Sequence, residues 1–152
     1  MRLSRILLPL FLALGACSAP TEPADPRALL AQNRALWGSS NISAYQYTIT
    51  RYCECTPESA GPVVVEVRSG KVETARYIDG AAVDPQFSGL FTNVPGLFDL
   101  IEEALNRPAA AASARYHASL GYPESIQIDW VAGAVDDEIS YRITDFSPLP
   151  RR

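Results

Sequence analysis

The sequence is poor in the residues from which most catalytic and metal sites are built. Its 152 residues include one histidine, His117, and three cysteines. A closed zinc site takes four nitrogen or sulfur ligands, and His117 lies far along the chain from Cys53 and Cys55. The sequence also lacks a Gly-x-Ser-x-Gly nucleophile elbow and a glycine-rich phosphate loop. We therefore expect no metal, no cofactor and no enzymatic activity.

Positive charge is also scarce. The chain has 13 Lys and Arg against 17 Asp and Glu, for a formal net charge of −4. If Arg2 and Arg5 are removed with a leader, 13 − 2 = 11 basic residues face 17 acidic ones and the net charge becomes −6. Affinity for nucleic acid comes largely from basic side chains that neutralise phosphates, and anionic lipid headgroups attract polybasic segments. The sequence therefore predicts no nucleic-acid partner and no polybasic membrane patch.

A long apolar run is the third absence. Residues 6–14 form an apolar run of about nine residues behind Arg2 and Arg5, whereas a membrane-spanning helix needs about 20. A short run behind positive charges is typical of a cleaved secretory signal. The run ends in Leu14-Gly15-Ala16-Cys17, which resembles the lipobox of bacterial lipoprotein signal peptides.

This resemblance implies how the chain is held. Residues 1–16 would be a lipoprotein signal peptide, Cys17 would carry acyl chains such as palmitate, and residues 17–25 would be a lipidated flexible tether. Two or more acyl chains hold a protein stably on a bilayer, whereas one is marginal. Ser18, in place of aspartate, predicts the outer membrane and a domain facing the periplasm, with another bacterial membrane surface as the alternative. An ordinary secreted protein, cut within 13–19, is a further alternative.

The two remaining cysteines form an even pair in an oxidising compartment, where a disulfide is the default. Residues two apart on an extended strand have Cα atoms about 6.6–7 Å apart, at the upper limit for a disulfide. A Cys53–Cys55 disulfide therefore predicts a bend or bulge. The alternative is a redox-active dithiol whose thiol pKa is lowered by Arg51. Against this alternative, the pair is not a Cys-x-x-Cys motif in front of a helix.

The rest of the chain predicts one α+β domain over 26–147, followed by a tail at 148–152. Capping residues and apolar periodicity predict helices, and alternating apolar residues predict strands. A Ser69-Gly70 turn joins two of the strands. The fold class is therefore α+β, an antiparallel sheet packed against two helices, with helix and three strands occurring twice as in a tandem α-β-β-β arrangement. The expected helices cover 26–38 and 95–106, and the expected strands cover 45–50, 63–67, 71–78, 114–119, 124–130 and 138–146.

Six motifs occur in order along this domain. They are Trp37, Tyr45-x-Tyr47, Arg51-x-Cys53-x-Cys55, Leu97-Phe98, Gly121-Tyr122-Pro123-x-x-Ile126-x-x-Asp129 and Asp136-Asp137-Glu138-x-x-Tyr141. Together they resemble a family of small bacterial secreted and lipid-anchored proteins known only as a domain of unknown function. The resemblance covers about 29–146 and implies no reaction, cofactor or catalytic residue. One departure is His117, where the family pattern has aspartate.

Three residues are candidate contacts for a partner. Arg51 precedes the cysteines, and Phe87 lies in the segment 79–92, which has no clear period and is long for a structureless loop. Tyr122 either contacts a partner or covers the core beside a turn. We expect 136–138 to be a solvated turn, because it lacks the spaced ligands of a calcium loop.

Together these observations predict a lipid-anchored envelope protein that binds a protein or envelope component through a sheet face or through residues 79–92. The alternative function is a thiol–disulfide redox protein that uses Cys53 and Cys55. A third interpretation is a structural envelope protein without a specific ligand.

Overall fold

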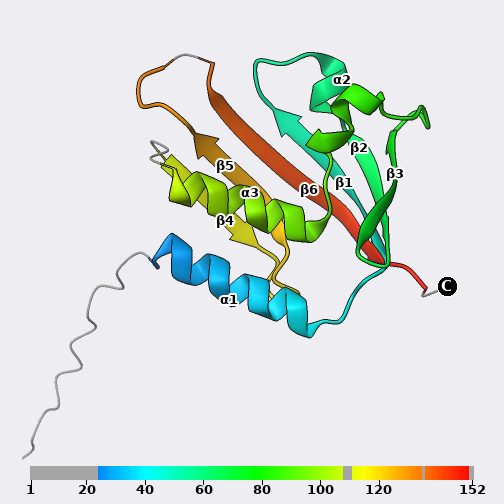
Figure 1. Ribbon diagram of the computed structural model, residues 1–152, viewed down its shortest axis with the longest axis horizontal. Helices are drawn as coiled ribbons and strands as arrows, with labels where there is room; N and C mark the ends of the chain where they lie inside the picture. Colours follow the sequence, from blue (N-terminus) through cyan, green and yellow to red (C-terminus); the bar gives the residue numbers. More distant parts are fainter. Residues whose placement is uncertain (1–23, 108–110, 135, 151–152) are drawn as a thin grey trace, which may run out of the picture.

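The computed structural model describes residues 24–107, 111–134 and 136–150, and the signal peptide and lipidation site predicted for 1–17 lie outside them. The described residues confirm the α+β class, with a six-stranded antiparallel sheet in the order β3-β2-β1-β6-β5-β4 (Figure 1). None of their helices is long and apolar enough to cross a membrane. The elements are α1 (Pro26–Ser39), β1 (Tyr45–Tyr52), α2 (Pro57–Ala60), β2 (Val63–Arg68), β3 (Lys71–Tyr77), the 3₁₀ helix η1 (Pro85–Leu90), α3 (Val94–Asn106), β4 (Ala111–Tyr116), β5 (Pro123–Asp129) and β6 (Glu138–Pro148).

Both long helices begin at side-chain caps. The Asp25 carboxylate accepts from the Arg27 amide at 3.0 Å at the start of α1, and the Asn93 side chain accepts from the Gly96 amide at 2.9 Å at the start of α3. Each cap satisfies an amide that has no partner within the helix. One face of each helix is buried, through Leu30 and Trp37 in α1 and through Val94, Leu97, Phe98, Ile101 and Ala104 in α3.

The sheet buries the face that the sequence alternation predicts. Tyr45, Tyr47 and Ile49 of β1 are at most 1% exposed, and Val63, Val65 and Val67 of β2 are fully buried beside them. The turn between β2 and β3 has positive φ values at Ser69 (50°) and Gly70 (75°), as a tight two-residue hairpin requires. The prediction of a Ser69-Gly70 turn is therefore confirmed.

The two halves of the chain share an element order and a strand order. Each half has a helix followed by three strands, with α2 and η1 added in the first half. Both halves place their strands in the same order across the sheet, so that β3-β2-β1 lies beside β6-β5-β4. Because β1 pairs with β6 in the antiparallel sense, each strand of the second half runs opposite to its counterpart in the first half. The predicted tandem arrangement therefore holds for the order of the elements but not for the direction of the strands.

Two sequence predictions about local structure are wrong. The strand expected over 114–119 is β4, which begins at Ala111 because Ala111 and Ala112 pair with Asp129 and Ile128 of β5. The segment 79–92 is not structureless. It pairs with β3 through a bridge between Arg76 and Ala82 and then forms η1. The alanines at the start of β4 carry no periodic signal, so pairing with β5 decides that case. In 79–92 the contacts are local, because the bridge joins residues six apart and the Asp84 carboxylate caps η1.

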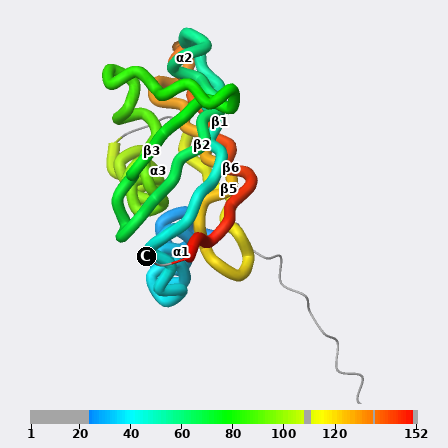
Figure 2. The backbone as a smooth tube through the Cα atoms, turned by 90° about the vertical axis from the view of Figure 1, so that its right-hand side faces the viewer, coloured from blue at the N-terminus to red at the C-terminus, as the bar shows by residue number. Residues whose placement is uncertain are grey.

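Both long helices cover the same face of the sheet (Figure 1). The view at right angles shows α3 to one side of β5 and β6 (Figure 2). The opposite face has partly or fully exposed polar side chains, such as Thr48 of β1, Gln127 of β5 and Thr144 of β6. No helix among the described residues packs against that face, which we call the open face.

Candidate functional site

The disulfide predicted from the sequence is present just beyond the end of β1. Cys53 and Cys55 are bonded to each other, with their Cα atoms 5.2 Å apart. The chain bends at both residues, as the distance limit on an extended strand required, and the Cys55 amide donates to the Cys53 carbonyl at 2.8 Å. The bend turns the chain from β1 toward the short helix α2. Cys55 is exposed, so solvent reaches this end of the bond.

Arg51 has a structural role near the disulfide, at the end of β1. Its guanidinium donates to the carbonyl of Ser59 in α2 and lies over the ring of Tyr141 in β6, 5.7 Å from the ring centroid. Arg51 therefore ties α2 to the sheet. Because the two sulfurs are bonded to each other, there is no thiolate in this state for the guanidinium to stabilise.

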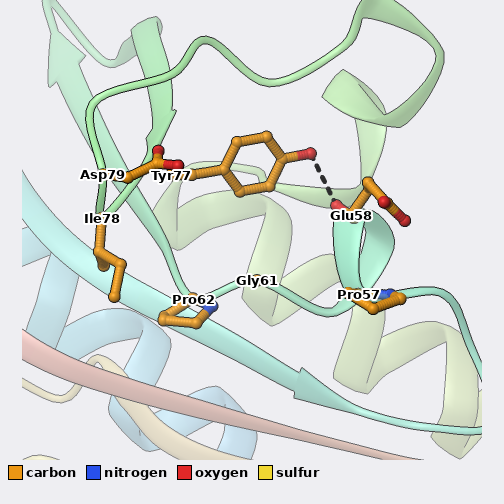
Figure 3. A pocket seen from close by; sticks show the side chains of 7 residues that line it. All are labelled: Pro57, Glu58, Gly61, Pro62, Tyr77, Ile78 and Asp79. Carbon is orange, nitrogen blue, oxygen red and sulfur yellow. Dashed lines mark hydrogen bonds between the residues drawn. The ribbon is translucent and has the colours of Figure 1, made fainter.

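A small slot lies between α2 and the end of β3 (Figure 3). Its volume is about 300 Å³, and its walls include Pro57, Pro62, Tyr77 and the 70% exposed Ile78. The Tyr77 hydroxyl donates to the Glu58 carbonyl at 2.8 Å across the slot. Desolvation raises the pKa of Tyr77 above its usual value, and nearby carboxylates, Glu58 first, raise it further. The slot is mainly apolar, with acidic groups around it.

Tyr122 takes the core position that the sequence left as an alternative. It is 8% exposed, and its ring stacks on Phe146 and on His117 at centroid distances of 4.4 and 4.9 Å. Gly121 before it has φ 75°, and a Cβ there would lie 2.5 Å from the Asn33 carbonyl oxygen of α1. The turn and the core contact therefore account for this motif, and a buried ring offers little surface to a partner.

The sequence predicts His117 on a strand, but in the structure it lies in the turn after β4. Its Nδ1 accepts from the amides of Ser119 and Leu120, at 3.3 and 3.1 Å. Phe87 lies in η1, is partly buried and packs against the core. Its predicted contact with a partner stays a prediction.

The acidic turn before β6 is held by a hydrogen bond within the chain. Oδ2 of Asp137 accepts from the Val131 amide at 2.5 Å, which closes the loop between β5 and β6. Within the described ranges, no group of three or more His, Cys, Asp or Glu side chains is placed to hold a metal ion.

A groove of about 600 Å³ lies on the open face and is larger than the slot beside α2. It runs over β4, β5 and β6, and cross-strand pairing places Arg115, Ser125 and Arg142 side by side in one row. Further polar side chains, Ser113, Glu124, Gln127 and Thr144, line it on both sides of this row.

Sequence analysis missed this groove, although part of its signal was readable. Ser125 and Gln127 alternate with buried Ile126 and Ile128, which marks them as the solvent side of a strand. The sequence does not show that β4, β5 and β6 are neighbours, so it could not place the two arginines together.

Residues 29–148 match the model of a family of unknown function, DUF6174. Since the match covers most of the chain, the protein belongs to this family, and the resemblance noted from its motifs is confirmed at that level. No curated protein sequence matches the chain.

Proposed function

We propose that this member of the DUF6174 family is a non-enzymatic binding module, anchored to the bacterial outer membrane through lipid on Cys17 and facing the periplasm. The open face of its sheet would bind a protein or another component of the cell envelope. The observation that carries this proposal is the polar groove on the open face, over which no helix of the described ranges packs.

The position of α1, the first described element, supports this arrangement. The described chain enters at α1, where the Arg27 guanidinium donates to the Asn106 side chain at 2.7 Å at the end of α3. A tether that leads from Cys17 to α1 therefore reaches the helix layer. The open face lies on the other side of the sheet (Figures 1 and 2), where an anchor at α1 leaves it accessible.

Photocrosslinking in living cells tests the proposal. A photoreactive amino acid at Gln127 or at Thr144, both exposed on the open face, should give a discrete crosslinked partner. The matched control is Gln32, which is exposed on α1, and it should not give the same product. The absence of any product from both open-face positions would contradict the proposal, as would an identical product from Gln32.

The exposed disulfide supports a second candidate, a thiol–disulfide redox protein. Exposure of Cys55 would give a thiolate of another protein access to the bond. Replacing both cysteines by serine separates the two candidates. Partner capture from Gln127 should persist in the double variant if the disulfide is structural. Loss of capture with an unchanged fold would favour the redox function.

A further inference from the structure

The row of side chains across the groove has a charge pattern suited to carboxylates. Ser125 of β5 pairs with Arg115 of β4 on one side and with Arg142 of β6 on the other. Adjacent strands are about 4.8 Å apart, so the two arginine Cα atoms lie about 10 Å apart with a hydroxyl between them.

Neither arginine of this row is neutralised by a carboxylate. Arg115 is exposed and makes no ion pair or hydrogen bond with any described residue. The Arg142 guanidinium lies over the ring of Tyr52, 5.9 Å from its centroid. By contrast, the partly exposed Arg34 is paired with Asp99 and Glu102, and the exposed Arg107 is paired with Glu103. In a chain whose net charge is −4, two unpaired guanidinium groups in one groove are positioned for an anionic ligand.

The neighbouring groups favour a peptide over a phosphate-rich ligand. Ser125, Gln127 and Thr144 offer both donors and acceptors, which a peptide backbone needs, whereas phosphate only accepts. Glu124 lines the groove, and the Thr144 hydroxyl donates to the Asp145 carboxylate at 2.8 Å, so this end would repel a polyanion. Tyr52 is 52% exposed on the open face, and Tyr and Arg are enriched at protein interfaces.

We infer that the groove binds an extended acidic peptide segment of a partner protein, whose Asp or Glu side chains pair with Arg115 and Arg142. In the polyproline II form of an extended peptide, which has three residues per turn, residues three positions apart lie on the same side and about 9 Å apart, so carboxylates at that spacing fit the row. An apolar side chain beyond them would lie on Tyr52. This inference rests on the proposed function, because it names the class of partner that the open face would bind.

The test uses the full lipidated chain in maltoside micelles and a fluorescent peptide, Gly-Glu-Gly-Gly-Glu-Gly, with blocked ends. The Arg115→Gln/Arg142→Gln variant should weaken binding about tenfold for each arginine, the loss typical of a charge-assisted hydrogen bond. The control variant Arg34→Gln/Arg107→Gln removes the same charge from the helix layer and should bind as the unchanged chain does. A peptide with Gln in place of Glu should also bind at least tenfold more weakly.

Equal affinity for the Glu and Gln peptides would overturn the inference. Displacement of the Glu peptide by an equal concentration of inorganic phosphate would also overturn it, in favour of a phosphate site. Photocrosslinking separates this failure from failure of the proposed function. If capture from Gln127 in cells persists in Arg115→Gln/Arg142→Gln, the open face binds its partner by other contacts and only the acidic-peptide inference fails.

Discussion

Replacement of Gly121 by alanine should destabilise the protein more than the same change at Gly70, a glycine with the same φ. Gly121 and Gly70 both have φ 75°, a region that costs an L-residue about 1–2 kcal/mol. Around Gly70 nothing lies within 4 Å of the added Cβ. At Gly121 the added Cβ would lie 2.5 Å from the Asn33 carbonyl oxygen and 3.1 Å from the Leu36 Cβ, so α1 must shift.

The magnitude follows from these two surroundings. The backbone cost is common to both variants, and overpacking a close contact costs a further 1–3 kcal/mol, roughly. Gly121→Ala should therefore lower the free energy of unfolding by about 1–3 kcal/mol more than Gly70→Ala does.

Urea unfolding of the lipidated chain in maltoside micelles, followed by tryptophan fluorescence, measures the difference. Trp37 of α1 packs edge-to-face on Tyr45 and Tyr122. Its emission therefore reports whether α1 is packed against the sheet. Equal destabilisation by both variants would refute the close approach of the β4–β5 turn to α1.

The remaining predictions concern the anchor, the disulfide and a buried tyrosine. Cys17→Ser should move the protein out of the membrane fraction and remove the mass of the acyl chains; retention at unchanged mass would disprove lipidation. Cys53→Ser/Cys55→Ser should lower stability by at most about 1.6 kcal/mol, because the bond closes a three-residue loop; a loss of 4 kcal/mol would show a larger role. Burial raises the pKa of Tyr45 to about 12, although the hydrogen bond from the Val94 amide opposes this. In the unfolded state the Tyr45 hydroxyl ionises near pH 10, so between pH 10 and 12 the unfolded state binds fewer protons than the folded state does. The free energy of unfolding should therefore fall over this range by on the order of 2–3 kcal/mol. A free energy of unfolding that stays constant from pH 10 to 12 would contradict the burial of Tyr45.

Much of the secondary structure could be predicted because its signals are local. Asp25 and Pro26 mark the start of α1, and the alternation at Tyr45, Tyr47 and Ile49 marks β1. A cap satisfies an amide two or three residues away, and alternation follows from the two-residue repeat of a strand. The covalent limit on a Cys-x-Cys bridge is equally local, which is why the bend at Cys53 was predictable.

The candidate site could not be predicted in the same way. Tyr122 carried a turn signal that did not distinguish a core ring from a binding ring, and only its contacts with Phe146 and His117 show that it is buried. Phe87 lay in a segment without a period, yet it packs on the core through η1.

The sequence by itself determined the two long helices, the core face of the strands and the position of the disulfide, and it predicts the anchor at Cys17. Each depends on neighbours within a few positions along the chain. Only the tertiary structure decided that Arg115, Ser125 and Arg142 form one row, and that both long helices cover the opposite face. The physical reason is that the order of strands in a sheet is set by long-range pairing, which leaves no periodic trace in the sequence, whereas alternation shows only which face of each strand is buried.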